Sequence, residues 1–138
     1  MGGTVVNEEE KRWMAEINTF PPGAAPCLIR MEYTDTELFS GVLTLFVSTV
    51  HGKYRICFPR TAAYLSRIEA YTSVHTDEIY TGTCIREYTK SCFLDLMKKM
   101  TFADRVEKFR HYGVYTENTV IDIASFTEPE ITKIRSKG

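Results

Sequence analysis

The chain has 138 residues, a size at which one domain buries about two thirds of the surface that its unfolded form exposes. Hydrophobic residues make up 43% and charged residues 25%, the composition of a globular protein. Lys and Arg number 17 against 18 Asp and Glu, so the net charge of −1 provides no global attraction to nucleic acid or to an acidic membrane. We therefore expect no nucleic-acid partner and no membrane partner.

The four cysteines are scattered along the chain, at Cys27, Cys57, Cys84 and Cys92. None forms a CxxC pair, so a zinc-ribbon or thioredoxin-like motif has no support, and we expect small core residues. No apolar segment with a cleavage site follows Met1. The sequence therefore predicts a cytoplasmic protein with reduced thiols, and two disulfides are the alternative.

A helix is predicted over residues 8–18, because Asn7 is a favourable N-cap and three glutamates follow it in the first turn. The proline-rich stretch that follows ends this helix. We assign residues 1–26 to the helix and loop, 27–134 to an α+β body and 135–138 to a frayed tail, all within a single domain.

Strands are predicted next. Residues 27–33 have strand-like composition, and the alternation of apolar residues predicts a hairpin over 41–58 that turns at His51-Gly52 and ends at Pro59. Residues 60–72 fit both a helical stripe and a strand-like alternation, and we favour a short helix capped by Thr61. The β-branched residues of 78–87 predict one further strand.

Phe93, Leu96, Met97 and Met100 recur at helical spacing, so residues 91–100 form the clearest predicted helix, capped by Ser91 or Thr89. A second short helix, containing Val106 and Phe109, is predicted to start at 101–104. An edge strand is predicted at 131–134. The fold class is therefore α+β: a mostly antiparallel sheet, made of a meander and a C-terminal hairpin, covered on one face by two to four short helices.

The stretch from His111 to Ser125 predicts that C-terminal hairpin. With Glu117 and Asn118 as the turn, Gly113 faces Asp122 and His111 faces Ala124. His111 and Asp122 are then diagonal neighbours on one face, roughly 7–8 Å apart at the backbone. Gly113 is expected to leave room above the carboxylate.

This pair suggests catalysis, because a general base needs a tunable histidine and an orienting carboxylate. We name His111, Asp122 and Tyr115 as candidate catalytic residues. Ser91, Cys92 and Cys84 are available nucleophiles, but the sequence does not bring any of them to the histidine. The alternative is structural: His111 ends a helix, and Asp122 accepts hydrogen bonds within the sheet.

No metal site and no cofactor are predicted. His51, His75 and His111 lie far apart, with no HxH or HExxH spacing, and no phosphate-binding glycine loop occurs. His75, near two acidic residues, gives only a weak indication of a divalent ion.

Tyrosines and arginines gather in the central half of the chain, the residue types enriched where proteins bind partners. From them we select five candidate ligand- or partner-binding residues: Arg30, Arg60, Tyr64, Arg86 and Tyr88. Arg30 lies in an apolar strand and needs a partner, for which Glu32 is the simplest choice. Residues 86–111 carry seven Lys or Arg against four acidic residues, which indicates a solvated helical face or an anionic partner.

These observations predict a small interaction or ligand-binding module that holds a protein partner or a small molecule. The alternative is a small hydrolase or transferase that uses His111 and Asp122 on a modest anionic substrate held by Arg60 or Arg86. Self-association is a further expectation, because exposed sheet edges can pair with a second copy.

Overall fold

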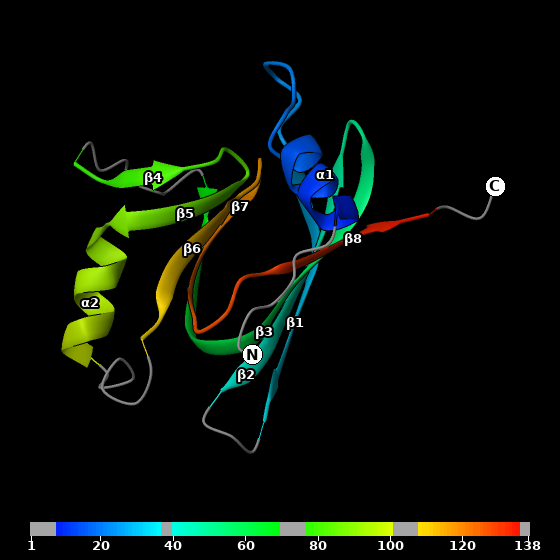
Figure 1. Cartoon of the computed structure of the whole chain (residues 1–138). Helices are drawn as coiled ribbons and strands as arrows, with labels where there is room; N and C mark the ends of the chain where they lie inside the picture. Colours follow the sequence, from blue (N-terminus) through cyan, green and yellow to red (C-terminus); the bar gives the residue numbers. More distant parts are fainter. Residues whose placement is uncertain (1–7, 37–39, 70–76, 101–107, 136–138) are drawn as a thin grey trace.

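The computed structural model describes residues 8–36, 40–69, 77–100 and 108–135. These ranges contain two helices and eight strands (Figure 1). Their order is α1 (Glu8–Ile17), β1 (Cys27–Asp35), β2 (Gly41–Thr49), β3 (Gly52–Ile68), β4 (Ile79–Thr81), β5 (Ile85–Lys90), α2 (Cys92–Met100), β6 (Arg110–Tyr115), β7 (Thr119–Ser125) and β8 (Glu130–Ile134).

All the strands join in one antiparallel sheet with the order β1-β2-β3-β7-β6-β5-β4, and β8 pairs with β3 off this path. The predicted class, α+β with a mostly antiparallel sheet, is confirmed. The helix predicted to start at 101–104 lies outside the described residues, and Phe109 is not helical. Among the described residues, neither helix has the length and apolar character needed to cross a bilayer.

Strand β3 corrects the prediction for residues 60–72, because the strand continues through Pro59 to Ile68 where we favoured a helix. Its first half pairs with β2 and β8, and its second half pairs with β7 from Thr61 onward. Pro59 lies at this change of partners and has no paired residue in any of the three ladders. Its missing N–H therefore costs no ladder hydrogen bond, so the strand does not end there.

The strand predicted over 78–87 is two strands, β4 and β5, joined by a tight turn. Gly82 lies in this turn at φ 94°, a left-handed conformation that favours glycine. A Cβ at Gly82 would lie 2.0 Å from the carbonyl oxygen of Ile85, so a side chain is excluded. The alternation of side chains over residues 78–87 did not by itself reveal that the chain reverses direction at Gly82.

The main hydrophobic core lies on one face of the sheet and receives side chains from both halves of it. Its buried members are Ile17, Leu43, Leu45, Val47, Tyr54, Ile56, Phe58, Cys84, Ile85, Tyr112, Val114, Ile121, Ile123 and Ile131. A smaller cluster under α2 contains Phe93, Met97 and Ala124. In Figure 1, α1 lies over β8, whereas α2 lies beside β5 and β6.

The end of α1 is bound to the sheet by polar contacts. Asn18 Oδ1 accepts the backbone N–H groups of Cys84 and Ile85 at 2.9 and 2.8 Å. Glu16 accepts hydrogen bonds from the Tyr54 hydroxyl and, at 2.5 Å, from Lys133 Nζ. These contacts join α1 to β3, β8 and the turn before β5.

Replacing Glu16 with Gln should make stability less dependent on pH. The hydrogen bonds from Lys133 and then Tyr54 lower the pKa of Glu16 below its ordinary value of 4.5. The carboxylate therefore stabilises the fold above about pH 4.5, and this contribution is lost as the pH falls through the lowered pKa. We expect Glu16→Gln to lose about 1 kcal/mol at pH 7 in urea denaturation, and less at pH 3.

The matched control is Glu9→Gln, because Glu9 lies on the same helix and is exposed. An equal loss for Glu16→Gln at both pH values would contradict the assigned role.

Candidate functional site

The predicted hairpin register is confirmed. The cross-strand pairs of β6 and β7 include His111 with Ala124, Gly113 with Asp122 and Tyr115 with Val120. His111 and Asp122 therefore share a face as diagonal neighbours, and they are in contact: His111 Nε2 lies 2.8 Å from Asp122 Oδ1.

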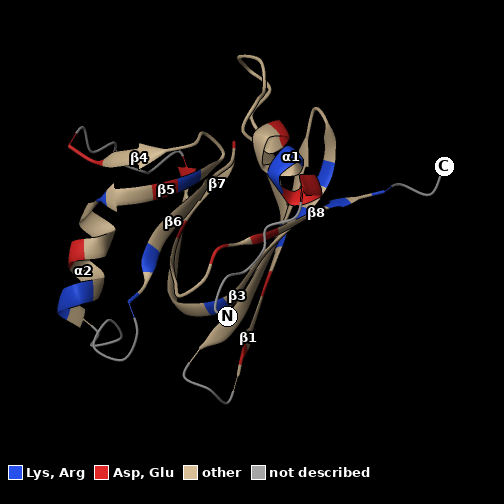
Figure 2. Ribbon diagram, in the orientation of Figure 1, with Lys and Arg blue, Asp and Glu red and all other residues tan. Residues whose placement is uncertain are grey.

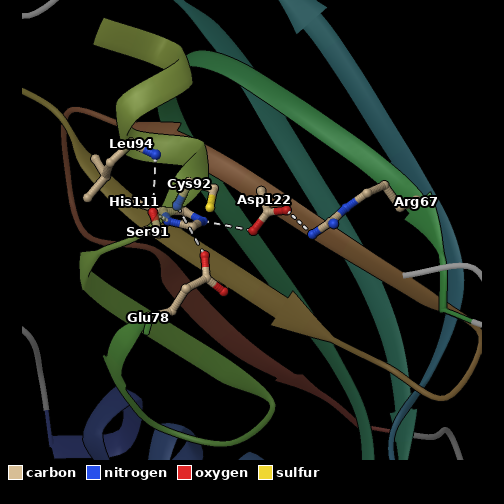
Figure 3. A network of polar contacts seen from close by, with 7 residues as sticks. All are labelled: Arg67, Glu78, Ser91, Cys92, Leu94, His111 and Asp122. Atoms are coloured by element: carbon tan, nitrogen blue, oxygen red, sulfur yellow. Dashed lines mark hydrogen bonds and ion pairs between the residues drawn. The ribbon is translucent and has the colours of Figure 1, made fainter. Parts of the chain in front are cut away.

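This pair belongs to a longer polar network that joins three parts of the chain (Figure 3). Ser91 Oγ lies 2.6 Å from His111 Nδ1, and Arg67 donates to Asp122 Oδ2 at 2.5 Å. Ser91 directly precedes α2, and its Oγ also accepts the N–H of Leu94 at 3.1 Å. Ser91 is thus the N-cap of α2, one of the two caps that the sequence allowed.

The network runs without a break from the cap of α2 to Arg67. Ser91 Oγ accepts the Leu94 N–H and is hydrogen-bonded to His111 Nδ1. The other ring nitrogen, Nε2, is hydrogen-bonded to Asp122 Oδ1, and Asp122 Oδ2 accepts from Arg67. Both ring nitrogens are used, and the carboxylate is balanced by one guanidinium.

The imidazole of His111 is enclosed by aromatic rings. Tyr88 stacks on it, with ring centroids 4.1 Å apart and planes 12° apart, and Phe93 of α2 lies at 4.6 Å. A Cβ on Gly113 would lie 2.9 Å from the Tyr88 ring. Gly113 therefore leaves room for Tyr88, and burial raises the pKa of that tyrosine.

The network is buried, which limits its chemistry. His111 is 1% exposed, and Ser91 and Asp122 are each 4% exposed. Two pockets lie on either side of it: His111 lines one and Asp122 lines the other, whereas Ser91 lines neither of them. A substrate would therefore have to displace the helix cap to reach the Ser91 hydroxyl.

The first pocket lies between α2 and strands β5 and β6, and we call it the α2 pocket. It has a volume of about 400 Å³. Its described lining combines an apolar and aromatic part with polar and charged side chains: Glu87, Tyr88, Thr89, Leu94, Lys98, Lys108, Phe109, Arg110 and His111.

The second pocket, of about 130 Å³, lies between α2 and the second half of β3. It is lined by Leu65, Arg67, Glu78, Tyr88, Cys92, Phe93, Leu96, Tyr115 and Asp122. The exposed Cys92 is the first residue of α2, and its N–H donates to Glu78 Oε2 at 3.2 Å. Burial raises the pKa of another thiol, Cys84, to about 12.

The five predicted binding residues are not all in one place. Arg86 and Tyr88 lie on β5, and the Arg86 guanidinium covers the Tyr115 ring at 3.6 Å. Arg60 lies over Phe126, and Tyr64 contacts Tyr33. Arg30 pairs with Glu32 at 3.1 Å, as expected, on a strand that is largely exposed. Tyr88 also lines the α2 pocket.

Tyr115, the third predicted catalytic residue, lines the second pocket with Asp122, whereas the rings that pack on His111 are those of Tyr88 and Phe93. Arg67 was not predicted, because the favoured helix over 60–72 removed it from the sheet. The strand-like alternation over residues 60–72 was the signal that could have placed Arg67. In a strand, Leu65 lies opposite Asp122, and Arg67 lies two residues further on.

No family model, curated protein or solved structure matches this chain. Within the described ranges, no group of three or more His, Cys, Asp or Glu side chains is arranged to hold a metal ion. All four cysteines are free.

Replacing Ser91 with Ala should destabilise the protein by about 1–3 kcal/mol. The change removes the acceptor for the Leu94 N–H and the hydrogen-bond partner of His111 Nδ1, and leaves a buried ring nitrogen without a partner. Chemical denaturation measures the loss, and Ser91→Thr is the control because it retains the hydroxyl. If Ser91→Ala were as stable as the native protein, the hydroxyl would not hold the network together.

Proposed function

We propose that the protein is a small ligand-binding domain that holds its ligand in the α2 pocket. The observation that carries this proposal is the size of the pocket together with its mixed lining. About 400 Å³ lies within the range of roughly 300–1,000 Å³ typical of small-molecule sites. Leu94 and Phe109 supply apolar surface, and Thr89 supplies a hydroxyl.

The floor of the pocket supports this proposal, because it is rigid. His111 is held at both ring nitrogens and is stacked by Tyr88, so its position does not depend on a ligand. A site that is formed before binding pays less entropy to order its side chains.

We further propose a cytoplasmic protein, supported by four free cysteines. A protein partner is an alternative occupant, and the exposed β1 strand at the end of the sheet supports self-association.

Filling the α2 pocket should abolish binding without unfolding the protein. Leu94 is half-buried and lines this pocket, so Leu94→Trp would occupy part of its volume. Native mass spectrometry of protein purified from its host should show an added small mass on the native chain and none on this variant.

The matched control is Leu96→Trp, because Leu96 lies on the same helix but lines the second pocket. An added mass retained by Leu94→Trp and lost by Leu96→Trp would assign the ligand to the second pocket instead. Bare chains in the native protein and both variants would argue against a tightly held ligand.

A hydrolase or transferase is the second candidate, favoured by the contact of His111 with Asp122 and by the Ser91 hydroxyl at 2.6 Å. Its substrate would enter the second pocket, where Asp122, Tyr115 and Arg67 meet. The buried Ser91 argues against a serine nucleophile.

Asp122→Asn distinguishes the two functions. We expect this change to lower stability by roughly 2–4 kcal/mol, because it removes the charge that balances Arg67 and weakens the bond to His111. Thermal unfolding and hydrolysis of a nitrophenyl ester and a nitrophenyl phosphate are measured together. Measurable turnover that Asp122→Asn and His111→Ala abolish at unchanged melting temperature would favour the enzyme.

A further inference from the structure

We infer that the ligand of the α2 pocket is a small organic anion with an apolar body. This inference rests on the proposed function. Among the residues that the structure describes, three cationic side chains line the pocket, at Lys98, Lys108 and Arg110, against the single carboxylate of Glu87. This described lining is therefore positive although the chain as a whole carries a charge of −1.

The three cations come from separate segments. Lys98 lies in the last turn of α2, Lys108 precedes β6, and Arg110 is the first residue of β6. Figure 2 shows Lys and Arg, in blue, at the end of α2 and near the start of β6. A lysine in the last turn also suits the helix dipole, but that explanation does not extend to Lys108 or Arg110. Like charges gathered around one pocket repel each other, and a bound anion relieves this repulsion.

Within the described part of the chain, the cations that line this pocket have only weak ion-pair partners. Arg110 approaches Glu87 at 3.8 Å and Glu128 at 3.6 Å, and its side chain is 56% exposed. Such exposed pairs contribute little. Lys98 and Lys108 form no ion pair with any residue in the described ranges. An incoming carboxylate, sulfate or phosphate group would gain charge-assisted hydrogen bonds without breaking a strong internal pair.

The apolar part of the lining indicates that the remainder of the ligand, beyond its anionic group, is apolar. Leu94 and Phe109 are half-buried, and the ring of Tyr88 is almost wholly buried. A bare inorganic anion would leave the exposed parts of Leu94 and Phe109 without a partner, whereas a short alkyl chain or one aromatic ring would cover them. The pocket volume of about 400 Å³ accommodates a molecule of this size.

The test uses three probes that share one chain length and differ in charge: octanoate, octanol and octylamine. Titrations of the full chain are followed by amide chemical shifts at low and at moderate salt. We expect octanoate to bind at least about tenfold more tightly than octanol, octylamine not to bind, and octanoate affinity to fall with salt. The shifts should map to α2, β5 and the start of β6.

Charge reversal supplies the matched variants. Lys98→Glu with Lys108→Glu should weaken octanoate about tenfold or more and leave octanol unchanged. Lys99→Glu is the control, since Lys99 is exposed on the same helical turn but does not line the pocket. We expect it to change the octanoate affinity by less than about twofold.

The outcomes separate the two proposals. Equal binding of octanoate and octanol, both abolished by Leu94→Trp, would overturn the anionic ligand and retain the binding pocket. No binding of any probe would overturn both. Phosphatidylserine vesicles test whether the pocket binds an anionic lipid headgroup rather than a free molecule. Cosedimentation with these vesicles, together with no chemical-shift change on adding octanoate, would overturn the proposal of a free ligand.

Discussion

The change of partners along β3 is the constraint on which the rest of the structure depends. Up to Cys57 the strand lies between β2 and β8, and from Thr61 it lies beside β7. Thr61 lies opposite both Gly41 and Ser125, so the two halves of the sheet meet at this residue. The buried Thr61 hydroxyl donates to the Phe58 carbonyl, which satisfies a backbone acceptor where the ladder is irregular. One strand therefore holds both halves of the core.

The polar network follows from the same strand. Because β7 pairs with the second half of β3, Asp122 lies opposite Leu65 and within reach of Arg67. Because β6 pairs with the other edge of β7, His111 reaches the same carboxylate from the opposite side. If the register between β3 and β7 slipped by one residue, Asp122 would lie on the opposite face of the sheet from Arg67 and His111. Its carboxylate would then be buried among apolar side chains. The buried charge of Asp122 thus favours this register of β3 with β7. Through His111 and Ser91 it also favours the observed position of α2.

Local features of this fold were predictable from the sequence, and contacts between distant segments were not. A two-residue turn fixes the register of the hairpin around Glu117 and Asn118, so the approach of His111 to Asp122 could be derived in advance. The amphipathic spacing of α2 and its serine cap are equally local. Joining Ser91 to His111, 20 residues away, requires the position of α2 on the sheet, which depends on tertiary packing.

The error over residues 60–72 has a similar cause. Proline normally ends a strand because it removes a ladder hydrogen bond, and at Pro59 that expectation fails because the ladder is irregular where the strand exchanges one partner for another. Such an exchange is a property of the whole sheet. Arg67 was lost from the site with that error, although it balances the charge of Asp122.

The network also connects the cap of α2 to the α2 pocket, whose lining includes His111. Ser91 fixes the first turn of α2 to His111, and Lys98 at the other end of the same helix lines the α2 pocket. A rigid helix transmits its position along its length, so we expect the depth of the pocket to depend on the cap, about two turns away. The buried serine, histidine and aspartate can thus serve the proposed function as supports for the wall of the site. A loosened cap would then weaken binding even where every residue that lines the pocket is unchanged.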